Sequence, residues 1–323
     1  MLKTLLKDIF SRRSIHPGLN GSQDASGMTT AMSDALSNAA RDIGAQLRFV
    51  SDISHTAIIN NAIQLLDFEL ERHPRYGDPK RLLRHAFQVN SQNGEDGMIH
   101  EVFRRIATQS RVFVEIGVGD GRECNTAFLL SQGWTGYWID GDDSFVRTLE
   151  GRADLAGGCI KHSVAHVSRE NIATLLEQLE VPKEFDLLSL DIDQNTYYIW
   201  EGLKQFRPRV VVAEYNGAFP PDLEWKVHYD PNRTWDGSQN FGASLRAFET
   251  LGAQLGYRLV GCDFTGINAF FVRSDLVADQ FAEPLTSENH YEPTRYHFTL
   301  RRSHRSAILD RIDTVARDGS IIR

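Results

Sequence analysis

The sequence predicts an α/β protein in which a mainly parallel sheet is covered by helices, and three observations support this. From Ser110 onward, short apolar runs alternate with helical patterns, which is typical of parallel strands joined by helical crossovers. Each run is followed by glycine or polar residues, at the strand end where open α/β sheets bind ligands. Only residues 264–267 separate the last two runs. So short a turn requires an antiparallel hairpin, because a parallel pair needs a long crossover.

The first five strands are expected to be parallel and the last two to form the hairpin. The expected strands are Val112–Gly117, Gly136–Asp140, Cys159–Val164, Phe185–Leu190, Arg209–Glu214, Tyr257–Asp263 and Asn268–Val272. Between the parallel strands, helical patterns cover residues 123–132, 144–155, 169–180 and 197–206.

Three segments are expected along the chain. Residues 1–85 are predicted to be a helical N-terminal extension, with a flexible connector rich in Ser and Gly near 14–30. Residues 86–280 are predicted to be the sheet domain, and 281–323 a C-terminal tail that is helical near its end. Residues 1–13 are amphipathic, and they are interpreted either as a helix that packs on protein or as a weak membrane-surface contact.

Composition excludes several classes of protein. A net charge of -8 argues against a nucleic-acid partner. No uncharged apolar run reaches about eighteen residues, so no transmembrane segment is expected. Three cysteines without a CxxC pair exclude a disulfide framework and a structural zinc module, and they suit a reducing compartment. A cytoplasmic protein is therefore expected, and the sequence does not indicate its oligomeric state.

The sharpest local signal is the Gly-rich turn VEIGVGDG at 114–121, between a strand and a helix. At Gly117 and Gly119 a side chain would occupy the volume of a bound nucleoside. The spacing is GxGxG, whereas a dinucleotide site has GxGxxG to admit a pyrophosphate. Glu115, at the strand end, suits the cationic amino-acid end of S-adenosylmethionine better than a diphosphate. A tight strand-to-helix connection without a ligand is the alternative.

The second strand ends in Asp140, 25 residues after Glu115, which is the distance expected of the next strand-helix unit. A carboxylate at this position can accept hydrogen bonds from both ribose hydroxyls. The alternative is that Asp140, with Asp142 and Asp143, caps the following helix.

The fourth and fifth strands bring acidic residues to the same edge. Asp191 and Asp193 follow one strand, and Glu214 and Asn216 lie at the end of the next. Their mutual repulsion indicates a hard cation such as Mg²⁺, with Asp191, Glu214 and Asn216 as its ligands. Alternatively, Asp191 contacts the cofactor amine, Asp193 caps a helix and Glu214 pairs with an arginine.

Two loops are further candidates. The segment SQNGEDG at 91–97 is expected either to cover the cofactor, with Gln92 in contact, or only to cap a helix. The loop at 217–241 is long and aromatic, and it follows the fifth strand, so it is expected to hold the acceptor through Trp225, His228, Tyr229 and Trp235. His228 is the candidate general base because its ordinary pKa suits proton transfer near neutrality, and Asp193 is the alternative base.

In several blocks the chain resembles the FkbM-like family of S-adenosylmethionine-dependent methyltransferases. The blocks are SQNGEDG, VEIGVGDGRECNT, WIDGD, LSLDIDQN, VVVAEYN, GASL and NAFFVR, and they span residues 87–275. The resemblance implies a class I methyltransferase fold, with Glu115, Gly117 and Gly119 at the methionine end of the cofactor and Asp140 at its ribose. The acidic edge is similar to the metal site of catechol-type O-methyltransferases, although Gln194 stands where those enzymes have a basic residue.

These observations predict an S-adenosylmethionine-dependent O-methyltransferase that acts on a hydroxyl of a saccharide or glycan precursor, with Mg²⁺ or another divalent cation as a second cofactor. Methyl transfer is an in-line displacement, so the enzyme mainly has to align two reactants and remove one proton. A nicotinamide-dependent sugar oxidoreductase and a non-catalytic cofactor-binding scaffold protein are the alternatives.

Overall fold

The computed structural model describes residues 36–47, 49–50, 53–54, 64, 68, 72–151, 158–295, 314–315 and 321–322. The chain divides into two compact units, Met1–Ala57 and Ile58–Arg323. In the first unit residues 36–47 are helical, as the apolar spacing predicts, and their large apolar side chains are exposed. The predicted amphipathic segment 1–13 and connector 14–30 lie outside the described residues.

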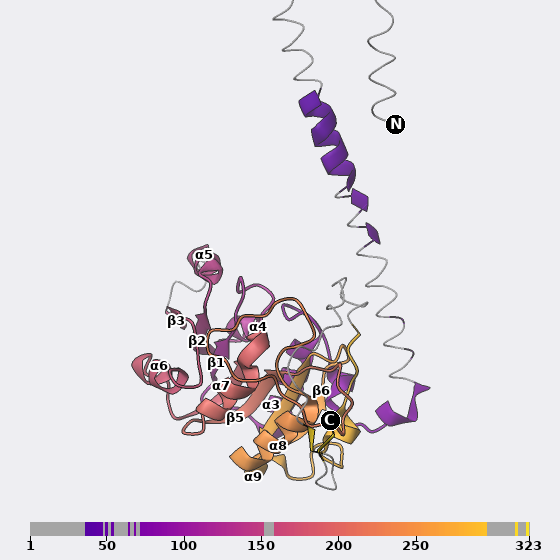
Figure 1. The fold of residues 1–323 in the computed structure, drawn as a ribbon, viewed down its shortest axis with the longest axis vertical. Coiled ribbons are helices and arrows are strands. Elements are labelled where there is room, and N and C mark those ends of the chain that lie inside the picture. Colours follow the sequence, from indigo (N-terminus) through magenta and orange to yellow (C-terminus); the bar gives the residue numbers. More distant parts are fainter. Residues whose placement is uncertain are drawn as a thin grey trace, which may run out of the picture. The chain divides into compact units, whose positions relative to one another are not determined.

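A seven-stranded sheet forms the centre of the second unit (Figure 1). Its strands are β1 Val112–Ile116, β2 Thr135–Asp140, β3 Ile160–Val164, β4 Glu184–Leu190, β5 Arg207–Glu214, β6 Tyr257–Cys262 and β7 Asn268–Arg273. The order is β3-β2-β1-β4-β5-β7-β6; β1 to β5 are parallel, and β7 runs antiparallel between β5 and β6. This is the Rossmann-like class I methyltransferase fold, and each strand ends within two residues of its predicted bounds.

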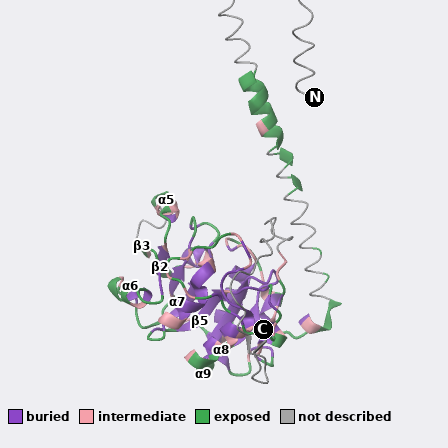
Figure 2. Cartoon of the chain, viewed as in Figure 1, coloured by how far each residue is buried: buried purple, intermediate pink, exposed green. Residues whose placement is uncertain are grey.

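Helices cover both faces of the sheet, and the sheet is buried between them (Figure 2). One apolar cluster joins a sheet face to α3 Glu95–Ile106, α4 Ala127–Ser131 and α5 Ser144–Glu150. The other joins the opposite face to α6 Ile172–Gln178, α7 Thr196–Gly202 and α8 Leu245–Leu255. Apolar runs such as VVVA at 210–213 are buried on both sides, which explains why the strands read as continuous apolar runs.

Strand register aligns the candidate residues at one edge. Ile116 on β1 pairs with Ile139 on β2 and with Leu190 on β4, and Leu190 pairs with Ala213 on β5. The residues that follow these four positions are Gly117, Asp140, Asp191 and Glu214. The register alone therefore brings them together.

Residues on both sides of the expected sheet domain, 86–280, also pack into its core. Tyr76, Leu82 and Leu83 are buried in the apolar cluster on the α3 face, and so are Phe281 and Leu285. Short helices complete this part of the chain at Pro74–Tyr76, Leu82–His85, α9 Ser274–Val277 and α10 Ser287–His290. The Pro- and Gly-rich stretch at 74–79 is therefore a set of tight turns within the fold.

Most of the C-terminal tail that is expected to be helical near its end lies outside the described residues, and four residues near the C-terminus are described as strands. Thr314–Val315 (β8) and Ile321–Ile322 (β9) pair as antiparallel strands. All four residues are β-branched, and such side chains favour extended backbone. Within the described part of the chain, no helix has the length and apolar character needed to cross a membrane.

Candidate cofactor and acceptor cleft

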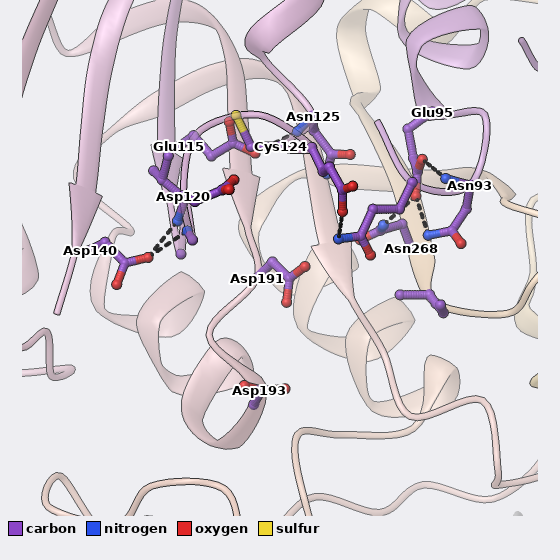
Figure 3. Close-up of a pocket in the computed structure, with 16 residues that line it drawn as sticks. Asn93, Glu95, Glu115, Asp120, Cys124, Asn125, Asp140, Asp191, Asp193 and Asn268 are labelled. Carbon is purple, nitrogen blue, oxygen red and sulfur yellow. Dashed lines mark hydrogen bonds between the residues drawn. The ribbon is translucent and has the colours of Figure 1, made fainter. Parts of the chain in front are cut away.

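Two adjoining cavities, of about 330 and 260 Å³, lie at the carboxyl edge of the sheet. Figure 3 shows the larger one. The two cavities share Gly117, Asp140, Asp191 and Asp193, so they are two chambers of one cleft. The predicted site residues that line the larger chamber are Gln92, Glu115, Gly117, Gly119, Asp140, Asp191 and Asp193. The structure thus brings together the candidates from β1, β2, β4 and the segment before α3.

The glycines of the Gly-rich turn have different roles. A Cβ at Gly117 would lie 1.6 Å from the Asp191 carbonyl oxygen, so this glycine lets β1 and β4 approach at their ends. At Gly121 a Cβ would lie 2.9 Å from the Trp138 ring, which is a packing requirement. At Gly119, with φ +61°, no protein atom lies within 4 Å of the Cβ position. Of the three, only Gly119 leaves space that a ligand could fill.

Asp140 holds this turn in place. Its Oδ2 accepts hydrogen bonds from the backbone N–H groups of Val118 at 2.7 Å and Gly119 at 2.8 Å. Its Oδ1 accepts one from Asp142 N at 2.9 Å. Each carboxylate oxygen has two lone pairs, so Oδ2 is fully used and Oδ1 can accept one more hydrogen bond. Asp140 therefore shapes the Gly-rich turn and can still meet a ribose hydroxyl.

Glu115 is buried and fixes the loop between β1 and α4. Its carboxylate accepts hydrogen bonds from Asn125 N at 2.9 Å, Thr126 N at 3.1 Å and Ser189 Oγ at 3.1 Å. Thr126 Oγ1 also donates to it, and Trp138 Nε1 donates to Thr126 Oγ1 at 2.9 Å. Burial raises the pKa of Glu115 against the effect of these donors. Its role in the structure is to tie the backbone N–H groups directly before α4 to β1.

The segment 91–97 both caps α3 and lines the cleft, so the two interpretations of it are compatible. Asp96 Oδ2 accepts from the backbone N–H groups of residues 89–91, and Asp96 N donates to Ser91 Oγ at 3.0 Å. Gln92 Nε2 donates to Glu123 Oε2 at 3.1 Å, which connects the segment to the loop after β1. Gln92, Asn93 and Glu95 face the larger chamber.

Three carboxylates from neighbouring strand ends meet at this edge. Oxygens of Asp191, Asp193 and Glu214 lie within 4.8 Å of one another. Three oxygen donors at this separation fit a hard divalent cation, whose preferred ligands are carboxylates and carbonyls. Asn216 differs from the prediction. Its Nδ2 donates to the carbonyls of Gln239 and Phe241, its Oδ1 accepts from Ala218 N, and it lines neither chamber. Asp193 takes its place in the cluster.

The smaller chamber is more apolar and has a few buried polar groups. Apolar side chains come from Ile116, Ala165, Val167, Ile192 and Trp235. Gln194 is 2% exposed, and its Nε2 has no hydrogen-bond partner among the described residues. His166, which the sequence alone does not distinguish, also lines this chamber, and its ring nitrogen lies 2.6 Å from the Pro231 carbonyl. This combination suits a flat ring with polar edges.

The aromatic loop at 217–241 differs from the prediction. Trp225 is 3% exposed and stacks on Phe219 at 4.3 Å, so it belongs to the core. Tyr229 packs against Tyr198 of α7. His228 is exposed and lines neither chamber. Only Trp235, with its neighbours Arg233 and Thr234, reaches the cleft. The loop is long because it wraps the domain, and its aromatic residues mostly fill the core.

Sequence reasoning missed the far side of the larger chamber. Asn268 opens β7, pairs with Glu214 on β5, and donates through Nδ2 to Glu95 Oε1 at 2.7 Å. Behind it Asp263 is buried and accepts from Thr265 N at 2.7 Å and Ile267 N at 3.0 Å, which closes the β6–β7 turn. Burial and the charge of Glu95 raise the pKa of Asp263 to about 7. In the sequence, the signal that could have indicated this side of the chamber is Asn268 at the start of one expected strand and Glu214 at the end of another.

No protein-family model and no curated protein matches this chain. Among solved structures, the N-terminal domain of EvdMO1 with SAH bound is 12% identical, with 63% of this chain and 94% of that chain covered and a TM-score of 0.36. The CcbJ methyltransferase from Streptomyces caelestis is 12% identical, with coverages of 60% and 97% and a TM-score of 0.35. An O-methyltransferase family protein from Burkholderia thailandensis is 9% identical, with coverages of 55% and 57% and a TM-score of 0.34. Since these TM-scores are low, the fold assignment depends on the strand order and directions described above.

Proposed function

We propose that this protein is an S-adenosylmethionine-dependent O-methyltransferase that acts on a hydroxyl of a saccharide or glycan precursor. The observation that carries the proposal is the chemistry of the larger chamber. The charged side chains that line it are all carboxylates: Glu95, Glu115, Asp120, Glu123, Asp140, Asp191 and Asp193. A sulfonium cation is favoured beside such a wall, whereas a diphosphate is repelled by it.

The start of α4 also argues against a nicotinamide cofactor. In dinucleotide sites the first N–H groups of this helix receive the pyrophosphate. Here the N–H groups of Asn125 and Thr126, directly before α4, donate to Glu115, and Ala127 N, the first N–H of the helix, donates to the Cys124 carbonyl. The larger chamber also has no basic side chain in its lining to hold a pyrophosphate.

The two chambers suit the two ends of S-adenosylmethionine. The purine fits the more apolar smaller chamber, between Ala165, Val167 and Trp235. The ribose then lies at Asp140, which both chambers share, and the methionine end passes Gly119 into the larger chamber. In this placement the cofactor fills the space beside Gly119, and the purine can accept a hydrogen bond from Gln194 Nε2.

The reaction requires alignment and one proton transfer. The acceptor oxygen forms a bond to the methyl carbon while the bond from that carbon to sulfur breaks, so the sulfonium becomes a neutral thioether. The hydroxyl proton goes to a base, and we assign this role to Asp193, which lines both chambers. His228 is not retained for this role because it lies outside the cleft.

We further propose that Asp191, Asp193 and Glu214 each offer one carboxylate oxygen to Mg²⁺ or a similar cation, which leaves the second oxygen of Asp193 to accept the hydroxyl proton. Bound there, the cation would lower the pKa of an acceptor hydroxyl. The separation of the three carboxylates supports this ligand set. A cytoplasmic location belongs to the same proposal, because all three cysteines are thiols, as expected in a reducing compartment.

Binding and turnover together test the function. Calorimetry with S-adenosylhomocysteine and with NAD should give binding of the first only, and tighter binding of NAD would overturn the assignment. Transfer of a labelled methyl group to candidate saccharides, read by product mass spectrometry, separates an enzyme from a cofactor-binding scaffold protein. Cofactor binding without turnover on any saccharide would favour the scaffold.

A further inference from the structure

With the cofactor placed between Asp140 and Asp191, the far corner of the larger chamber is left for the acceptor. Asn93, Glu95 and Asn268 form this corner, on the opposite side of Asp191 from Asp140 (Figure 3). We infer that the corner binds an amine of the acceptor, separate from the hydroxyl that is methylated, so that the acceptor is an amino sugar or a similar amino polyol. This inference rests on the proposed function and specifies its substrate class.

The hydrogen bonds within the corner leave two buried acceptor atoms without a partner, on residues that line the chamber. Asn93 N at 2.7 Å, Asn93 Nδ2 at 2.9 Å and Asn268 Nδ2 at 2.7 Å all donate to the carboxylate of Glu95. Both amides therefore point their donors at Glu95. Their oxygens, Asn93 Oδ1 and Asn268 Oδ1, are buried and have no hydrogen-bond partner among the described residues. Buried acceptors in this state are costly unless a ligand supplies the donor.

Asn268 carries the strongest part of this argument because it is held rigidly. It is 3% exposed, and its backbone N–H donates to Asp263 while its Nδ2 donates to Glu95. Neither donor can turn toward the chamber without breaking a bond to a buried carboxylate. The Oδ1 atom is thus fixed as an acceptor that a ligand must satisfy.

Charge decides which donor fits best. A hydroxyl offers one proton and no charge, whereas an ammonium offers three protons and a positive charge. Glu95 is a carboxylate and is 1% exposed, so the corner is negative and poorly solvated. Hydrogen bonds between charged groups are the strong ones in such surroundings. The oxygens of a phosphate or carboxylate are themselves hydrogen-bond acceptors, so such a group could not donate to Asn93 Oδ1 or Asn268 Oδ1.

Three compounds on one scaffold test the inference: glucosamine, glucose and glucuronate. Each is titrated into the protein saturated with S-adenosylhomocysteine and followed by saturation-transfer NMR, and each is also assayed as a methyl acceptor. We expect glucosamine to bind at least tenfold more tightly than glucose, and glucuronate to bind most weakly.

Variants then locate the preference. Glu95→Gln removes the charge of the corner, and Asn93→Ala removes one acceptor oxygen while it keeps the backbone donor to Glu95. Both should reduce the advantage of glucosamine over glucose at least tenfold, and Asn93→Ala should leave the affinity for S-adenosylhomocysteine unchanged. Glu249→Gln is the control, because Glu249 is a half-buried carboxylate outside the cleft that accepts from Ser287 N. It should keep the preference of the wild type.

Several results would overturn the inference. One is no advantage for the amine, including the case in which none of the three compounds binds. Another is a weakened affinity for S-adenosylhomocysteine in Asn93→Ala, which would assign the corner to the amine of the cofactor instead. If the wild type does not bind S-adenosylhomocysteine at all, the proposed function itself fails, and the two failures are thereby distinguished.

Discussion

Replacing Gly119 by alanine tests whether the open face of the Gly-rich turn meets the cofactor. Gly119 has φ +61°, and no protein atom lies within 4 Å of its Cβ position. The new methyl group therefore strains the backbone but collides with nothing in the protein. A non-glycine residue in the left-handed region costs about 1–2 kcal/mol. We expect that loss in the free energy of unfolding, and a melting temperature lower by a few degrees.

Gly133→Ala is a matched control. Gly133 has φ +77°, also has no atom within 4 Å of its Cβ position, and lines neither chamber. The two variants should therefore lose similar stability in chemical unfolding. Only Gly119→Ala should weaken the binding of S-adenosylhomocysteine in calorimetry, by at least about tenfold, because a methyl group that displaces ligand contacts costs about 1.4 kcal/mol or more. Equal affinities in the two variants would refute the placement of the cofactor against Gly119.

Three other predictions concern metal, pH and packing. A chelator should abolish methyl transfer and added Mg²⁺ should restore it, without change in the affinity for S-adenosylhomocysteine; full activity in chelator would remove the cation from the cluster around Asp191. Because the pKa of Asp263 is raised to about 7 by burial and by Glu95, the folded protein holds a proton there that the unfolded chain releases near pH 4. The free energy of unfolding should therefore fall as the pH rises from about 5 to 7, by up to about 1.4 kcal/mol per pH unit from this group. In urea unfolding, Glu95→Gln should show a weaker dependence of this free energy on pH. An unchanged dependence would contradict the pairing of Asp263 with Glu95. Gly117→Ala places a Cβ 1.6 Å from the Asp191 carbonyl oxygen and should destabilise the fold by more than about 3 kcal/mol in the same unfolding assay, whereas a near-native stability would contradict the close approach of β1 and β4.

Strands and strand ends could be predicted closely because their signal is local. A run such as VVVAE at 210–214 is apolar where the strand is buried and becomes acidic where it ends, so the sequence marks both limits. Register then brings the strand ends together, and Gly119, Asp140 and Asp191 line the cleft as predicted. Helices were predicted less well. The pattern at 123–132 predicts a longer helix than Ala127–Ser131, because apolar spacing does not show where backbone hydrogen bonds begin and end.

The rest of the site depends on contacts between distant parts of the chain. Nothing near Asn268 in the sequence shows that its amide will meet Glu95, and nothing near Trp225 shows that its ring will stack on Phe219 inside the core. Aromatic residues in a long loop suit both a binding surface and an interior. Only the tertiary structure distinguishes the two, and it assigns Trp225 to the interior.

The position of β7 has a consequence for the order in which the molecule is built. Glu95 and Asn268 are 173 residues apart in the chain, and β6 pairs only with β7 within the main sheet. During synthesis the ends of β1, β2 and β4 can therefore assemble well before the corner has its second half. Closing so long a loop carries an entropic cost that the hairpin must offset when it joins β5. Acceptor recognition would then be the last property acquired by the nascent chain, and the first to be lost when the C-terminal hairpin frays.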